Sequence, residues 1–422
     1  MNRRDRMQQI NNQYEPETFE LSLRELLHNI RQEVNSNGYL VTNPFELLNL
    51  DIIYQLLRML KRKSDSQKRE ISDWLSNPNQ ANELLEKCKE SKYEFGTAKQ
   101  TTIKTNGKER LIYSYRTNDK IVLKFLSLVL NEIYNPDFYP TSFAYRPNLS
   151  IQAGMKLIEQ QSKEDNYCIK LDIHKCFNNI DTEKLIKIIE DKVKHPQFLK
   201  IIKKSLCTYT KVYGKKVKHS GIPQGSVHAP ILSNIYLHFC LDKPLRETYP
   251  NKAKLYRYAD DIYITMKENT SNQINEWLEH NLRDHNLSIS EKTPNVTSEL
   301  KNGQQFLGYK IEKERDQLTI DIDETNINQK IIEICLTKPE HLPNYLRSQI
   351  KSMNISKETQ DSWHNLLVAL PHSLRKKLNI KVNQDSLENL LAEIDLCVTP
   401  LLRELGTNYS NKSFRNQCMT ES

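Results

Sequence analysis

The chain has 422 residues, 27% of them charged and 37% hydrophobic, with 61 Lys and Arg against 53 Asp and Glu and a net charge of +8. This length can bury a sizeable core and favours several lobes over one compact unit. The basic excess suits a polyanionic partner, although a solvated basic surface gives the same count. Eight cysteines include no Cys-x-x-Cys pair, so the sequence indicates neither a zinc site nor a disulfide framework, and we expect a reduced, cytoplasmic location.

Neither a secretory leader nor a membrane span is expected. The first residues, MNRRDRMQQINNQ, are followed by no apolar run. Residues 220–241 carry no Lys, Arg, Asp or Glu, but their Pro, Gln, Gly, Asn and His residues exclude a span. The sequence therefore predicts no membrane partner.

The predicted elements change along the chain. Residues 19–92 are predicted to be helical, because apolar residues recur three and four positions apart. Residues 93–115 have the alternation of short strands about a TNG turn, and 119–135 are helical again. Strands and helices alternate over 165–315, and helices return after about Asn326. We find no repeat and no long linker, so these regions are expected to pack as lobes of one body.

Two adjacent acids stand out in the segment YRYADDIYI, residues 256–264. Apolar and polar residues alternate on both sides of Ala259, Asp260 and Asp261, which predicts a hairpin with the acids at or beside its turn. Acids in turns are often only solvated, so this segment alone leaves both interpretations open.

A third acid favours a chemical role. Asp172 sits among apolar neighbours in a strand-like run from Tyr167 to Ile173, and the following helix can be capped by Asp181. An unpaired carboxylate at the end of a buried strand is costly, and divalent cations would remove that cost. Asp172 and Asp260 could bind two Mg²⁺, supported by Asp261, in an arrangement suited to phosphoryl transfer.

The chain resembles bacterial reverse transcriptases, most closely those of the group II intron and retron-like branch. The resemblance runs from about residue 104 to 310, roughly half of the chain. It is carried by five segments in the family's order and approximate spacing: Asp172–Phe177, SGIPQGSVHAPILSNIYL, YADD, LSISEKT and FLGY.

The resemblance implies an α+β right-hand polymerase. We expect an N-terminal helical extension over 1–92 and fingers over 93–164. The palm, an antiparallel sheet with helices, is expected over 165–315, and a helical thumb or C-terminal region over 316–422.

The family's motifs imply roles for the residues around the acids. Asp172 and Asp260 match metal ligands, Asp261 is the neighbouring acid, and the Ile173 backbone carbonyl is a further ligand. Phe177 matches the steric gate, where an aromatic ring would crowd a ribose 2′-hydroxyl and favour deoxynucleotides. A plain core phenylalanine is the alternative for Phe177.

A glycine-containing loop is expected beneath the template and incoming nucleotide. Pro223, Gln224 and Gly225 match it: glycine permits close backbone approach, and the glutamine can hydrogen-bond sugar or base edges. A charge-free helix behind this loop can pack on the sheet. The family usually has Ser-Pro where this chain has Ala229-Pro230, which removes a hydroxyl.

Four basic residues are further candidates. Lys108 and Arg110 resemble the fingers cations that hold the triphosphate, and a guanidinium can bind phosphate bidentately. Arg146 matches a template-side or structural cation. Lys292 matches a lysine near the leaving pyrophosphate, where it could act as a general acid. For Lys108, Arg110 and Lys292, a solvated surface position is the alternative.

The primer end is expected to rest on Tyr258 and Ala259, the second small enough to let the primer approach. The segment FLGY resembles the primer-grip hairpin, which adds four template and primer candidates: Phe306, Leu307, Gly308 and Tyr309.

The implied reaction is DNA synthesis on an RNA template with two Mg²⁺ ions, for which Mn²⁺ could substitute. A primer 3′-hydroxyl attacks the α-phosphate of a dNTP and pyrophosphate leaves, and catalysis comes from positioning and charge neutralisation. The expected partners are a structured non-coding RNA as template, the cDNA product and dNTPs, with homo-oligomerisation also open.

Two departures narrow the implied role. We find no Val-Thr-Gly segment of the retron kind after FLGY and no Cys/His cluster of an endonuclease. The chain then resembles stand-alone reverse transcriptases, related to abortive-infection proteins, that defend against phage. A group II intron-type maturase lacking the endonuclease, an RNA-dependent RNA polymerase and a non-catalytic RNA-binding protein are the alternatives.

Overall fold

A computed structural model of the chain describes residues 16–60, 65–77, 79–105, 108–207, 209–212, 215–291, 296–315 and 317–322. The chain divides into two compact units. The first comprises Met1–Pro147, Leu171–Ile262 and Asn272–Asn295, and the second comprises Asn148–Lys170, Tyr263–Ser271 and Val296–Ser422. Most of the region predicted as a helical thumb, residues 323–422, lies outside the described residues.

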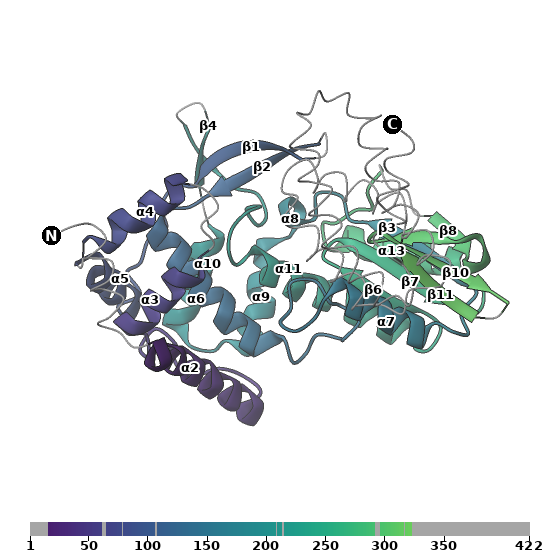
Figure 1. Cartoon of the computed structure of the whole chain (residues 1–422), viewed down its shortest axis with the longest axis horizontal. Helices are drawn as coiled ribbons and strands as arrows, with labels where there is room; N and C mark the ends of the chain where they lie inside the picture. Colours follow the sequence, from purple (N-terminus) through teal and green to yellow (C-terminus); the bar gives the residue numbers. More distant parts are fainter. Residues whose placement is uncertain are drawn as a thin grey trace, which may run out of the picture. The chain divides into compact units, whose positions relative to one another are not determined.

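The described part of the N-terminal region is helical, as its apolar periodicity predicts. Its helices are α2 (Pro16–Asn37), α3 (Leu50–Met59), α4 (Asp65–Leu75) and α5 (Asn79–Lys89). Helix α3 starts at Asn49, whose side chain accepts a 2.9 Å hydrogen bond from the Ile52 backbone nitrogen. Phe45 packs on Phe125 of α6 (Thr117–Tyr134), with ring centroids 5.1 Å apart. Helices α2 and α3 thus share a core with α6 (Figure 1).

Two β-hairpins of the first unit lie beside each other (Figure 1). Their strands are β1 (Lys99–Thr105), β2 (Lys108–Ser114), β4 (Tyr209–Val212) and β5 (Lys215–Lys218). The antiparallel pair of β1 and β2 confirms the strands predicted about the TNG turn. The Ala98 backbone nitrogen donates to the Tyr209 carbonyl at 2.8 Å, and Thr210 Oγ1 donates to the Ala98 carbonyl at 3.2 Å. These bonds join the two hairpins.

The palm sheet has four strands in the order β6-β7-β3-β8. They are β3 (Tyr167–Asp172), β6 (Lys254–Tyr258), β7 (Asp261–Met266) and β8 (Val296–Glu299). Strand β3 confirms the strand predicted from the apolar run, and β6 with β7 confirms the hairpin predicted around the acidic pair. Only Ala259 and Asp260 connect β6 to β7.

The remaining described α-helices are α7 (Ile151–Gln161), α8 (Cys176–Asn179), α9 (Thr182–Lys192), α10 (Pro196–Leu206), α11 (Ala229–Leu237), α12 (Lys243–Thr248) and α13 (Ser271–Asp284). Asp181 caps α9 as predicted, accepting hydrogen bonds from the backbone nitrogens of Glu183 at 2.9 Å and Lys184 at 3.1 Å. Leu185 and Ile189 of α9 are buried.

Helix α11 is the charge-free helix, and every residue in it except Pro230 is buried. It packs against α6, α8 and α9, so burial among helices accounts for its lack of charge. A π-helical turn, His238–Asp242, carries the chain from α11 into α12. None of the described helices combines the length and apolar character needed to cross a membrane.

A second sheet lies in the second unit, with strand order β11-β10-β9. Its strands are β9 (Gln304–Phe306), β10 (Tyr309–Glu314) and β11 (Gln317–Ile322). The first described residues of the region predicted as a helical thumb, 317–322, therefore form a strand. The reason is a period-two pattern that buries Leu318 and Ile320 on one face of β11.

A buried histidine ties the loop before α11 to α10. His228 is fully buried; Ser226 Oγ lies 2.7 Å from its Nδ1 and Ser205 Oγ lies 3.1 Å from its Nε2. Burial lowers the pKa of His228 to about 3. His228 is therefore neutral in the folded protein at neutral pH.

Acid should destabilise the protein through His228. Between about pH 6.5 and 3 the unfolded histidine binds a proton that the folded one does not, so unfolding free energy falls as pH falls, by up to about 1.4 kcal/mol per pH unit. His228→Gln should flatten this slope in urea titrations from pH 7 to 4.5. His280→Gln, at a side chain 78% exposed, is the control and should leave the slope unchanged. Equal slopes in wild type and His228→Gln would contradict the assignment.

Candidate active site

The end of β3 meets the β6–β7 turn, and this junction places two of the predicted ligands together. The Ile173 backbone nitrogen donates to the Asp260 carbonyl at 3.2 Å. On the other side of β3, the Ser290 backbone nitrogen donates to the Asp172 carbonyl at 2.8 Å. Both bonds join backbone groups, so they fix the positions of Asp172 and Asp260 whatever their side chains carry.

The thiol of Cys176 lies within the field of both carboxylates. Cys176 is 1% exposed. Burial first, and then the negative charges of Asp260 and Asp172, raise the pKa of this thiol to about 12. Both carboxylates therefore lie near one buried thiol, and two neighbouring carboxylates can share a bound cation.

The donor set is compatible with a hard divalent cation such as Mg²⁺. Within the described residues, no three His, Cys, Asp or Glu side chains form a group that could hold a metal ion. Magnesium does not need such a cage, because it is commonly held by one or two carboxylates together with water and substrate phosphates. Asp172 and Asp260 offer the carboxylates, and Asp261 begins β7 beside them. The antiparallel bridge of Ile173 with Ile289 is made through the Asp172 carbonyl and the His174 nitrogen, so the Ile173 carbonyl points away from that bridge, to the side of the strand where Ile173 bonds Asp260.

A buried arginine, not anticipated from the sequence, holds the turn that carries Asp260. Arg257 and Asp242 have side chains 0% and 1% exposed, and Arg257 Nε and Nη2 donate to the two Asp242 oxygens at 2.7 and 2.6 Å. Although burial opposes the charge, the guanidinium holds the pKa of Asp242 below its usual range. Arg257 Nη1 also donates to Asn234 Oδ1 at 3.1 Å and to the Ala259 carbonyl at 3.2 Å. Ala259 has φ 59°, a left-handed conformation costly for an L-residue, which these bonds help to hold.

Phe177, the predicted steric gate, follows β3 directly in α8. Its side chain is half-buried, whereas the core residues Phe143 and Phe198 are 1% and 0% exposed. Phe177 is therefore less buried than these core phenylalanines, and its role as a steric gate stays a prediction. The Phe177 carbonyl accepts a 2.7 Å hydrogen bond from the Ile222 backbone nitrogen. This bond fixes the glycine-containing loop against α8.

Gly221 permits that close approach. It has φ +66°, and a Cβ at this position would lie against the backbone carbonyl oxygens of Phe177 and Asn178, closer than van der Waals contact allows. The loop cannot accept a side chain here without shifting away from α8.

Gly221→Ala should therefore destabilise the protein more than the left-handed conformation alone explains. Gly38 is a matched control, because it has φ +82° but open space around a Cβ. We expect Gly38→Ala to cost about 1–2 kcal/mol of unfolding free energy and Gly221→Ala to cost about 1–3 kcal/mol more. Denaturant titration of both variants measures the difference in unfolding free energy. Equal losses would show that the loop can move away from α8 at no cost.

The same loop is pressed against strand β2. The Gln224 carbonyl accepts a 2.9 Å hydrogen bond from the Tyr113 backbone nitrogen, and Gly225 has φ +96°. A Cβ on Gly225 would lie 2.6 Å from Ile112 Cγ2. Pro223 is buried, Gln224 is half-buried and Gly225 is exposed, so the glutamine and second glycine can meet a ligand more directly than the proline.

Three predicted basic site residues cannot be assessed from the structure. The two predicted triphosphate ligands, Lys108 and Arg110, belong to β2, and the predicted general acid is Lys292. Lys108 and Arg110 pair in register with Thr105 and Ile103 of β1, but their side chains lie outside the described part of the structure. Lys292 lies outside the described residues altogether. The roles implied for these three residues stay predictions.

An aromatic surface adjoins the acidic turn. The Tyr258 ring is half-buried and lies 5.7 Å from the Phe143 ring and 6.2 Å from the Tyr145 ring, centroid to centroid. Tyr145 is 53% exposed, and Ala259 is 5% exposed. Tyr258 is thus supported from behind while keeping an accessible part, as a surface for a primer end would require.

Arg146 is held by internal hydrogen bonds. Its Nη1 donates to the Tyr139 and Ser142 carbonyls, both at 2.6 Å, and its Nε donates to Asn135 Oδ1 at 2.8 Å. Its Nη2 donates to the carbonyls of Asn135 and Phe138. Of the two roles predicted for this cation, this geometry favours the structural one.

The segment FLGY forms a tight connection between β9 and β10 in the second unit. Phe306 ends β9 and stacks on Tyr263 of β7, with centroids 5.0 Å apart. Leu307 and Gly308 have φ 52° and 87°, and Tyr309 starts β10. The hairpin expected from the resemblance is present, and its contact with a primer stays a prediction.

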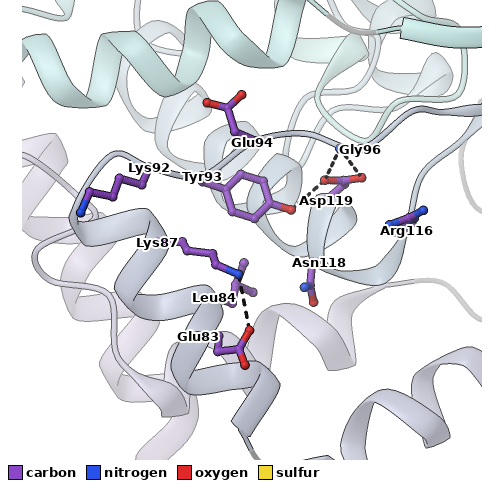
Figure 2. Close-up of a pocket in the computed structure, with 10 residues that line it drawn as sticks. All are labelled: Glu83, Leu84, Lys87, Lys92, Tyr93, Glu94, Gly96, Arg116, Asn118 and Asp119. Atoms are coloured by element: carbon purple, nitrogen blue, oxygen red, sulfur yellow. Dashed lines mark hydrogen bonds and ion pairs between the residues drawn. The ribbon is translucent and has the colours of Figure 1, made fainter. Parts of the chain in front are cut away.

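A separate cavity of about 340 Å³ lies between α5 and the start of α6 (Figure 2). Tyr93 Oη and the Gly96 backbone nitrogen donate to buried Asp119, at 2.7 and 3.2 Å to Oδ1. Burial raises the pKa of Asp119 despite these bonds. Cations and acids balance in its lining: Glu83, Leu84, Lys87, Lys92, Tyr93, Glu94, Gly96, Arg116, Asn118 and Asp119. The lining includes none of the sequence-predicted site residues.

The fold and the site define a class of protein, a right-hand polymerase of α+β type. Its marks are an acid at the end of a central palm strand, a second acid in the adjoining hairpin turn, and a glycine-containing loop joined to a fingers hairpin. A family model described as reverse transcriptase (RNA-dependent DNA polymerase) matches residues 98–311, just over half of the chain. The chain belongs to the reverse transcriptase family.

The similar proteins include intron-encoded ones. The COX1/OXI3 intron 2 protein of Saccharomyces cerevisiae is 26% identical over 351 residues, 68% of this chain and 40% of that protein. The group II intron-encoded protein LtrA of Lactococcus lactis subsp. cremoris is 34% identical over 121 residues, 28% of this chain and 20% of that protein. The chain thus spans less than half of these relatives. A solved structure of apo telomerase from Candida tropicalis has a TM-score of 0.44 at 14% identity, covering 54% of this chain and 55% of that chain.

Proposed function

We propose that this protein is an RNA-directed DNA polymerase that makes cDNA by two-metal nucleotidyl transfer. The observation that carries the proposal is the junction at which the Ile173 nitrogen bonds the Asp260 carbonyl, bringing the acid that ends β3 beside the acid of the β6–β7 turn. Membership of the reverse transcriptase family supports the choice of reaction.

In the proposed reaction, the primer 3′-oxygen forms a bond to the α-phosphorus of a dNTP while the bond to the β-phosphate oxygen breaks and pyrophosphate leaves. Asp172, Asp260 and the Ile173 carbonyl would hold Mg²⁺, with Asp261 beside them. When bound, the ions neutralise phosphate charge and lower the pKa of the attacking hydroxyl. Lys292 would give a proton to the leaving pyrophosphate.

The remaining residues orient the substrates. Phe177 would crowd a ribose 2′-hydroxyl, and Gln224 would hydrogen-bond the sugar or base edge. Tyr258 and Ala259 would lie under the primer end, and the Lys108 and Arg110 side chains would hold the triphosphate. Because no side chain bonds covalently to substrate, most of the rate would come from positioning and charge neutralisation.

Primer extension tests this proposal. The purified protein, given a DNA primer annealed to an RNA template, Mg²⁺ and labelled dNTPs, should extend the primer to the template end. It should select dNTPs over rNTPs in direct competition, and Phe177→Val should reduce that selection. Preference for rNTPs would establish the RNA polymerase alternative, and absence of incorporation with either set, in Mg²⁺ or Mn²⁺, would favour an RNA-binding role without catalysis.

Two biological roles are compatible with this chemistry. One is phage defence in the cytoplasm with a structured non-coding RNA as template, supported by the resemblance to stand-alone bacterial enzymes. The other is a group II intron-type maturase, favoured by the intron-encoded relatives. Sequencing RNA that copurifies with the protein separates them: intron RNA from the gene's own neighbourhood supports the maturase. A non-coding RNA with its cDNA, together with loss of phage resistance on gene deletion, supports defence.

A further inference from the structure

The acid-free part of the chain extends well beyond the charge-free helix. Residues 192–241 contain nine lysines and not one Asp or Glu, whereas the whole chain has 53 acids in 422 residues. At that average, about six acids would fall in a segment of this length. Exclusion of acids over fifty residues suggests that part of this segment meets a polyanion.

Lysines at the start of this segment pair with acids from elsewhere in the first unit. Lys192 Nζ lies 2.6 Å from Asp137 Oδ2, and Lys203 Nζ lies 2.6 Å from Glu190 Oε1. These pairs belong to the fold of α9 and α10, so they do not need an external anion.

The lysines of the β4–β5 hairpin differ. Every residue of β5 is exposed. Among the described side chains, no carboxylate lies within ion-pair distance of Lys215, Lys216 or Lys218. Instead, Lys216 Nζ lies over the Tyr209 ring, 5.7 Å from its centroid. These cations remain available to an outside partner.

One face of the hairpin combines cations with an aromatic ring. Tyr209 pairs in register with Lys218, and residue 211 pairs with Lys216. Because side chains alternate along strands and directly paired residues share a face, Tyr209, Lys216 and Lys218 lie on the same face. Tyr209 is 43% exposed, so its ring can be reached from solvent. Lysines that contact phosphates beside a ring on which a base can stack are the usual means of binding single-stranded nucleic acid.

Backbone bonds connect this face to the candidate active site. The Tyr209 carbonyl accepts from Ala98, the residue before β1. Strand β1 pairs with β2, and Tyr113 of β2 donates to the Gln224 carbonyl of the glycine-containing loop. The β4–β5 hairpin and the glycine-containing loop expected beneath the template are thus both hydrogen-bonded to the β1–β2 hairpin. Figure 1 shows β4 beside β1 and β2.

We infer that the face formed by Tyr209, Lys216 and Lys218 binds single-stranded RNA, the part of the template that has not yet been copied. The identification of that strand as template rests on the proposed function; the binding of single-stranded RNA does not. The two lysines contact successive phosphates, and Tyr209 stacks with a base.

The test compares two RNA–DNA hybrids that share one duplex, one blunt and one with a ten-nucleotide 5′ RNA overhang. Fluorescence anisotropy with the full-length protein gives the affinity for each at several KCl concentrations. Lys216→Gln with Lys218→Gln should weaken overhang binding about tenfold at 0.15 M salt and reduce the salt slope by about 1.4. Tyr209→Leu should weaken overhang binding about tenfold with little change of salt slope. Both variants should bind the blunt hybrid as wild type does, which also shows that they are folded.

Lys187→Gln with Lys252→Gln is the matched control, because it removes the same charge at two exposed lysines of α9 and of the turn before β6. It should leave overhang binding unchanged. The inference is overturned if the hairpin variants bind the overhang like wild type, or if blunt and overhang hybrids weaken equally. If the variants lose overhang affinity while the wild type extends no primer, the inference stands and the proposed function fails.

Discussion

Asp260→Asn is expected to lower the rate of nucleotide incorporation about a thousandfold or more while the fold survives. A ligand that stabilises charge at both the attacking and leaving oxygens contributes several kcal/mol to the transition state, and about 4 kcal/mol corresponds to a thousandfold. The fold should survive because the Asp260 backbone carbonyl, which accepts from Ile173, is kept by asparagine, and the two side chains have nearly the same size and shape. Single-nucleotide incorporation under single-turnover conditions gives the rate.

Two companions make this prediction specific. Asp172→Asn should produce a loss of similar size, because both carboxylates are proposed ligands of the catalytic Mg²⁺ ions. Asp284→Asn removes an equal charge from an exposed position, with a side chain 60% exposed, and should leave the rate within twofold. Raising the Mg²⁺ concentration should restore part of the lost rate in Asp260→Asn and Asp172→Asn. It should leave the rate of the Asp284→Asn control unchanged. A wild-type rate in Asp260→Asn would remove this carboxylate from the mechanism.

The elements that the sequence predicts correctly are those decided by local patterns. Alternation predicts the β6–β7 hairpin, and a short side chain before an apolar stripe predicts that Asp181 caps α9. The strand that ends at Asp172 is predicted by its apolar run. That Asp172 and Asp260 lie at one place is implied by the resemblance to reverse transcriptases, whose palm fixes which strands meet, and not by these elements alone.

The features that the sequence does not predict depend on contacts between distant residues. Arg257 sits in a strand pattern like any other polar position, and only the structure shows its pairing with Asp242 at the end of a π-helical turn. A signal was present at Asp242, which is the first acid after a run of fifty residues without one. The contact of Gly221 with the Phe177 carbonyl likewise joins separate segments.

Arg257→Met is expected to lower the free energy of unfolding by about 3–5 kcal/mol, because it leaves Asp242 buried without its partner. Asp242→Leu should cost a similar amount by stranding the guanidinium. Urea titration of the purified variants measures both losses. Asn234 and the Ala259 carbonyl also lose a donor when Arg257 is removed, which adds to the cost of Arg257→Met alone.

The double variant Arg257→Met with Asp242→Leu separates stability from positioning. Replacing a buried ion pair by apolar side chains is often nearly neutral, so the double variant should regain most of the lost unfolding free energy. Its incorporation rate should nevertheless stay well below wild type, because no side chain then donates to the Ala259 carbonyl or holds this left-handed turn in front of Asp260. A double variant with both stability and rate restored would mean that the turn holds its geometry without Arg257. If stability returns and the rate does not, the arginine acts on the reaction by holding the Asp260 turn in place.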